Sequence, residues 1–183
     1  MEIIKHRVNR LDDVEPNLGI EIDVRDYKNE LVLSHDPPND QCMKLKNFLE
    51  NISKDQLIAI NVKSSEIESE LKEIIHDLDV SNYFTFDWAF PSLRKALDIN
   101  ITCAFRLSEY EKEIVSNCTW VWIDCFEGIW YDVDFLDSLK KSGLKLALVS
   151  PELHNRESEI SKVKNIISSI KVDAICTDRP ELW

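Results

Sequence analysis

Hydrophobic and polar residues follow two alternating patterns along this chain. Eight short runs rich in β-branched and aromatic residues predict strands. They cover residues 2–7, 19–25, 57–63, 82–87, 101–107, 119–125, 144–150 and 172–177. Longer segments with helical spacing lie between them, as in 45–52 and 160–170, where apolar residues recur every three or four positions. This alternation predicts a parallel sheet with helical crossovers.

Residues at the ends of the helical segments support this interpretation. Ser65 and Glu68 have the spacing of a capping box, which predicts the start of a helix that contains Leu71. Gly143 lies where a C-cap glycine belongs, just before the strand at 144–150. Both signals agree with the strands beside them.

The number of repeats predicts a compact α/β fold, a TIM-type (β/α)8 barrel that forms a single domain over residues 1–183. Each repeat would have only about 23 residues, fewer than such barrels usually use, so some repeat must be shortened. We expect a truncated first unit, because residues 8–18 alone separate the first two strands and Pro16 breaks a helix there. Residues 31–36 follow the second strand too closely for a helix, which predicts a hairpin extension above the barrel.

The charge balance narrows the range of partners. With 34 acidic and 22 basic residues, the net charge is −12, which opposes binding to nucleic acid and to anionic membranes. No apolar run reaches the roughly 18 residues of a membrane helix, and the first residues lack a secretory pattern, so we expect a cytoplasmic protein. The five cysteines show no C-x-x-C spacing, and we expect reduced thiols. An anionic small-molecule substrate would then need a metal ion or a few placed cations.

A pair of acids on the second predicted strand is the first candidate for chemistry. Strict alternation in 19–25 places Glu21 and Asp23 on the face opposite Ile22, and in a barrel the apolar face meets the helices. Two carboxylates inside a barrel repel each other, and a hard divalent cation relieves that repulsion. The alternative interpretation is a solvated edge strand with a polar face.

Two histidines lie at the same predicted rim of the barrel. His6 ends the first strand, and His35 follows the second, at the barrel end where enzymes of this fold place their active sites. Two imidazoles beside an acid pair supply a proton acceptor and a proton donor near neutral pH. A two-histidine and carboxylate site for a redox transition metal remains an alternative, and would predict colour or redox activity.

Further polar residues are expected on the inner face. In 57–63 the alternation turns Asn61 and Lys63 inward, where an amide oxygen can complete a metal site and an ammonium can hold a phosphate oxygen. The alternative interpretation of Lys63 is a solvated residue at the end of its strand. Arg106 on the fifth strand can grip an anion or pair with a barrel carboxylate. For Asp124 on the sixth strand we favour a structural role, in packing and internal hydrogen bonding, over a role in the chemistry.

Other possible catalytic groups are less favoured. His76 lies in a helical segment and His154 in a polar loop, and we expect both at the surface. The chain has no G-x-S-x-G elbow and only three glycines, which argues against a serine nucleophile or a phosphate-cradling glycine loop.

Several motifs together resemble the glycerophosphodiester phosphodiesterase family, within the wider group of phosphatidylinositol-specific phospholipase C-like barrels. The chain is similar to a short, divergent member of that family. The resemblance covers both ends of the chain and is carried by His6-Arg7, by Glu21-Ile22-Asp23-Val24, by residues 31–36, by Ile60-Asn61-Val62-Lys63, and by residues 172–180.

The resemblance implies a metal-dependent phosphodiester hydrolase with a role in lipid metabolism. Glu21 and Asp23 look like ligands of Mg²⁺ or Ca²⁺, with Asn61 at the position of a third acidic ligand in the family. His6 and His35 look like the general base and acid, and Lys63 and Arg7 match cations near the substrate phosphate. A neighbouring hydroxyl of a glycerol-like alcohol would attack phosphorus and form a cyclic phosphate, which water then opens.

Departures from the family pattern leave alternatives open. Val8 replaces the usual glycine after His-Arg, Asn61 replaces an acid, and the run 146–150 lacks the Trp-Thr motif. One alternative is a catalytically degenerate barrel that binds a phosphorylated ligand or a partner. Another is a lyase that stops at the cyclic phosphate.

Overall fold

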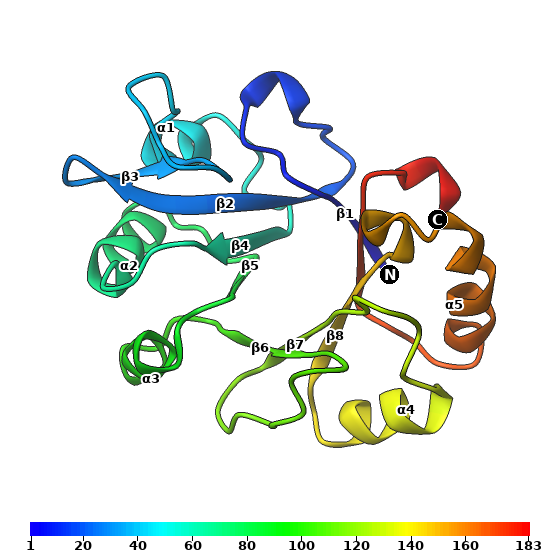
Figure 1. Ribbon diagram of the computed structural model, residues 1–183. Helices are drawn as coiled ribbons and strands as arrows, with labels where there is room; N and C mark the ends of the chain where they lie inside the picture. The colour runs from blue at the N-terminus through cyan, green and yellow to red at the C-terminus, as the bar shows by residue number, and fades with distance from the viewer.

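The computed structural model describes residues 1–183 and contains a nearly closed barrel of eight parallel strands (Figure 1). They are β1 (Glu2–Lys5), β2 (Gly19–Tyr27), β4 (Ile58–Val62), β5 (Tyr83–Phe86), β6 (Ala104–Leu107), β7 (Trp120–Ile123), β8 (Lys145–Val149) and β9 (Ala174–Thr177). Their order is β5-β4-β2-β1-β9-β8-β7-β6. An isolated parallel bridge between Thr85 and Cys103 joins the two ends of this order. The predicted TIM-type barrel and its eight strands are therefore confirmed.

Helices surround the strands, as Figure 1 shows. They are α1 (Leu45–Glu50), α2 (Glu68–Asp77), α3 (Phe90–Asp98), α4 (Val133–Lys141) and α5 (Ile160–Ile167). Only a single 3₁₀ turn, η1 (Leu11–Asp13), lies between β1 and β2, which confirms the truncated first unit. The connection from β6 to β7 also lacks a helix, a second shortening that the sequence pattern did not predict. No helix is long and apolar enough to cross a bilayer.

The predicted hairpin is also confirmed. β3 (Glu30–Leu33) pairs antiparallel with the extended end of β2, with Val24 opposite Leu33. Lys28 and Asn29 have φ of 52° and 62°, the left-handed pair that a tight two-residue hairpin turn requires. The backbone N–H of Ser34 then donates to the Asp23 carbonyl at 3.0 Å, which brings the chain after β3 back beside β2.

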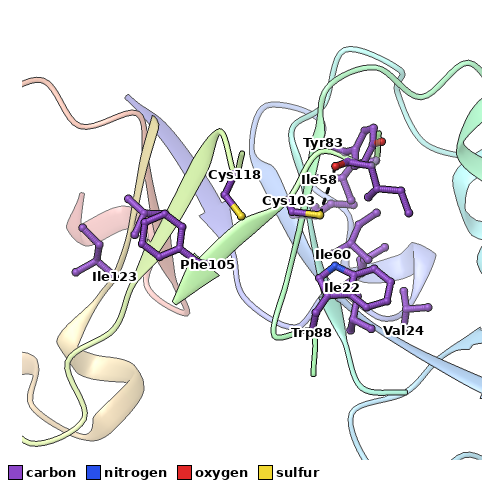
Figure 2. Close-up of a cluster of buried hydrophobic side chains, with 14 of the residues drawn as sticks. Ile22, Val24, Ile58, Ile60, Tyr83, Trp88, Cys103, Phe105, Cys118 and Ile123 are labelled. Atoms are coloured by element: carbon purple, nitrogen blue, oxygen red, sulfur yellow. Dashed lines mark hydrogen bonds between the residues drawn. The ribbon is translucent and has the colours of Figure 1, made fainter. Parts of the chain in front are cut away.

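Alternation along the strands sorts their side chains into two layers. Ile22 and Ile60 belong to the apolar layer between the sheet and the helices, part of which Figure 2 shows. Inside the barrel, Phe84 stacks on Trp120 and Phe86 stacks on Trp122, with ring centroids 4.4 and 4.0 Å apart. These rings pack the barrel interior, so the barrel is a filled core rather than a pore.

The two helix-end predictions have different outcomes. Gly143 has φ of 90° just after α4 and acts as the predicted C-terminal glycine. The capping box at Ser65 is wrong, because α2 begins at Glu68 and its N-cap residue is Ile67, without a side-chain cap. Glu68 therefore occupies the first helical position, rather than the third from which its side chain would reach back.

Candidate active site

The acid pair on β2 points into the barrel, as the alternation predicts. Glu21 and Asp23 are each only 1% exposed. In the parallel ladder with β4, the register partner of Asp23 is Asn61, so the carboxylate and the amide lie side by side on the inner face. Two acids and one amide thus share a small buried volume.

The environment of Glu21 favours its protonated form in the absence of a cation. Its Oε2 accepts a hydrogen bond from the backbone N–H of Arg7 at 2.7 Å, and Asn61 also contacts it. Burial and the neighbouring Asp23 carboxylate nevertheless raise the pKa of Glu21 to about 8. A bound cation would reverse this balance and favour the carboxylate.

Asp23 is held by two polar neighbours. Asn9 donates from Nδ2 to Asp23 Oδ2 at 2.8 Å and accepts the Asp23 backbone N–H at 2.9 Å. The Lys63 ammonium lies 3.3 Å from Asp23 Oδ1. Sequence reasoning missed Asn9, since a single asparagine in an irregular loop has no pattern that distinguishes it.

The donor set around these acids fits a hard divalent cation. Asn61 Oδ1 is a buried acceptor without a hydrogen-bond partner, and it belongs to the side chain beside Asp23. A buried unpaired oxygen next to two carboxylates is the environment that Mg²⁺ or Ca²⁺ prefers. The protein contains no group of three or more His, Cys, Asp or Glu side chains that could hold a metal, so Asn61 would have to serve as the neutral third ligand.

His6 lies directly after β1, beside this pair. Its Nδ1 is 3.0 Å from Asp178 Oδ1, in the segment that follows β9. Burial lowers the pKa of His6, although Asp178 partly offsets the effect. When Nδ1–H donates to Asp178, Nε2 is left as the proton acceptor of the ring. Asp178 lies within the C-terminal motif 172–180, although its partnership with His6 was not foreseen.

His35 occupies a more open position at the end of the hairpin. Its Nδ1 is 2.9 Å from Asp36 Oδ1, and 40% of its side chain is exposed. The Arg25 guanidinium donates to the His35 carbonyl at 2.9 Å, which fixes the backbone there. His35 lines a cleft of about 740 Å³, and Asn9, the residue that holds Asp23, lines the same cleft.

The three predicted phosphate-binding cations differ in their surroundings. Arg7 has φ of 55°, and its guanidinium is exposed beside His6. Lys63 contacts Asp23, as described above. Arg106 lies across the barrel on β6, where it forms hydrogen bonds with Asp87 and an ion pair with Asp124. The structure therefore brings the Lys63 ammonium and the Arg7 backbone N–H to the acid pair, whereas the Arg106 guanidinium pairs with barrel carboxylates.

The expectation that His154 is a surface residue is wrong. Its side chain is 22% exposed, and Nε2 lies 2.7 Å from Oδ1 of the buried Asp124. This contact agrees with the internal hydrogen bonding expected for Asp124. The contact joins the segment after β8 to the end of β7, residues far apart in sequence. His76, in contrast, is exposed on α2 as predicted.

Comparisons with known proteins give structural relatives only. No family model and no curated protein matches the chain. A glycerophosphodiester phosphodiesterase from Thermotoga maritima matches with 18% identity and a TM-score of 0.74, over 98% of this chain and 95% of that one. An Oleispira antarctica phosphodiesterase, in complex with the product sn-glycerol-3-phosphate, matches with 17% identity and a TM-score of 0.66, over 99% and 94%.

A glycerophosphoryl diester phosphodiesterase from Parabacteroides distasonis also has a TM-score of 0.66, with 15% identity over 99% of this chain and 84% of that one. The chain thus has the barrel fold of these phosphodiesterases along its whole length. The resemblance drawn from the sequence motifs is confirmed at the level of the fold.

Proposed function

We propose that the chain is a metal-dependent phosphodiester hydrolase that acts on a glycerophosphodiester-like substrate at the carboxyl end of its barrel. The observation that carries this proposal is the buried pair of Glu21 and Asp23, with Lys63 in contact with Asp23 and His6 directly after the neighbouring strand β1. The shared fold with three phosphodiesterases supports the same class of reaction.

Three side chains would hold the cation, namely Glu21, Asp23 and Asn61. When bound, Mg²⁺ or Ca²⁺ supplies positive charge that offsets the charge developing on the phosphoryl oxygens. Lys63 and Arg7 add two cationic groups for the non-bridging oxygens of the phosphate. Because the chain as a whole is strongly acidic, these local charges are what attract an anionic substrate.

The two histidines divide the proton transfers. His6, oriented by Asp178, accepts the proton of a neighbouring hydroxyl on the substrate alcohol through Nε2, and that hydroxyl oxygen attacks phosphorus. His35 gives a proton to the oxygen of the departing alcohol as its bond to phosphorus breaks. Water then opens the cyclic phosphate. A lyase would stop before this step, and phosphorus NMR of the products distinguishes the two outcomes.

The test is hydrolysis of glycerophosphocholine and of an aryl phosphodiester with Mg²⁺, Ca²⁺ or chelator. We expect metal-dependent turnover, and a loss of about 10²–10⁴-fold in kcat for His6→Ala and for His35→Ala. His76→Ala is the matched control, since this exposed helix residue should leave the rate unchanged. Absence of turnover under every metal condition would refute the proposal.

A second candidate is a barrel that binds a phosphorylated ligand without catalysis. The neutral Asn61 favours it, because only two carboxylates remain to hold a cation. In that case the wild-type chain would bind sn-glycerol 3-phosphate in calorimetry without turning over any diester. His6→Ala and His35→Ala would then keep the wild-type affinity.

A further inference from the structure

The cleft beside His35 is a polar cavity of about 740 Å³ between the loop after β1 and the loop after β3. Two of its lining residues connect it to the proposed chemistry: His35 itself, and Asn9, which donates to Asp23. A group seated in this cleft therefore lies next to the proposed proton donor and on the side of the acid pair where Asn9 is bound.

The lining of the cleft matches hydroxyl groups. Only 4 of its 13 lining residues are hydrophobic, and none is Phe, Tyr or Trp. The Gln41 side chain is exposed there, and Asn39 uses Oδ1 for the Gln41 backbone N–H at 2.9 Å, which leaves its amide hydrogens for a ligand. Amide side chains both donate and accept, as hydroxyls do. Arg10 and Asp12 on the facing loop bring one charge of each sign, and the third charged residue, Asp36, is paired with His35 at 2.9 Å.

A second cleft near the barrel rim has a different character. It has a volume of about 590 Å³, lies beside β5 and β6, and is lined mostly by hydrophobic residues, among them Trp88, Phe90 and Tyr110. Aromatic faces and acidic groups suit an apolar or cationic group. Because neither His35 nor any residue that contacts the acid pair lines it, the polar cleft is the better place for the substrate alcohol.

We propose, building on the proposed function, that the polar cleft receives the departing alcohol and selects an uncharged, polyhydroxylated one. In the reaction, the bond between phosphorus and the alcohol oxygen breaks, and that oxygen takes its proton from His35. The new bond to phosphorus comes from the neighbouring hydroxyl, whose proton passes to His6. The hydroxyls of the departing polyol meanwhile bind Asn39 and Gln41.

The test compares two diesters that share the glycerol phosphate half. Glycerophosphoinositol carries an uncharged polyol, and glycerophosphocholine carries a quaternary ammonium. We expect kcat/KM for the inositol ester to exceed that for the choline ester by about tenfold, the effect of one or two hydrogen bonds. Gln41→Leu should reduce this ratio toward one, whereas Asn165→Leu, an exposed amide on α5 outside the cleft, should preserve it.

Equal kcat/KM values, or a preference for the choline ester, would overturn the inference while leaving the hydrolase proposal intact. If neither ester is turned over, the hydrolase proposal fails. Calorimetry then tests separately whether the polar cleft prefers the uncharged polyol. The inference then requires glycerophosphoinositol to bind about tenfold more tightly than glycerophosphocholine, and Gln41→Leu to remove the difference. Equal affinities would refute it.

Discussion

Replacing Glu21 by glutamine tests the electrostatic cost of the buried acid pair. Burial and Asp23 raise the pKa of Glu21 from 4.5 to about 8. A carboxyl group with a raised pKa in the folded state stabilises the fold while protonated, and that contribution is lost as pH rises through the window from its unfolded to its folded pKa. Between pH 4.5 and 7 the loss amounts to roughly 3 kcal/mol, at about 1.36 kcal/mol per pH unit.

Glutamine removes the negative charge of Glu21 and keeps a side-chain oxygen that accepts the hydrogen bond from the Arg7 backbone N–H. In chelator at pH 7, Glu21→Gln should therefore be more stable than the wild type, by up to about 3 kcal/mol, and the difference should shrink toward pH 4.5. Urea unfolding followed by tryptophan fluorescence measures the free energy of unfolding of each protein. The difference between the two free energies cancels the titration of all other groups. A difference that is the same at both pH values would refute the reasoning.

Three more substitutions test the metal ligands, a buried ion pair and a helix end. Asn61→Glu, which adds a third acid, should tighten Mg²⁺ or Ca²⁺ binding in calorimetry; unchanged affinity would contradict the proposed ligand set. Arg106→Met leaves Asp87 and Asp124 without their cation and should cost about 3–5 kcal/mol in urea unfolding, whereas a loss below about 1 kcal/mol would contradict the pairing. Gly143→Ala forces φ of 90° on a residue with a Cβ and should lower stability by about 1 kcal/mol; an unchanged midpoint would contradict the strain argument.

Much of the architecture was predictable because it depends on local periodicity. The alternation in β2 identifies both the apolar side that packs against helices and the inward side that carries Glu21 and Asp23. The connection at 8–18 is too short for an α-helical crossover, and Pro16 breaks any α-helix there. These features require only the geometry of a strand and the closed shape of the barrel.

The features that were missed depend on contacts between distant segments. Asn9 matters only because the loop after β1 folds onto Asp23. The local sequence predicts a surface position for His154, but in the closed barrel the end of β7 lies beside it, where Asp124 contacts its ring. The residues after β6 show no periodic pattern that predicts either a helix or its absence. In the structure the chain crosses there to β7 without a helix.

The most direct test of this account is a crystal structure of the protein with Ca²⁺ and sn-glycerol 3-phosphate. We predict an anomalous peak within about 2.3–2.6 Å of oxygens of Glu21, Asp23 and Asn61, with the phosphate in contact with Lys63. A cation bound elsewhere, with Lys63 still paired to Asp23 and no phosphate beside His6, would contradict the account.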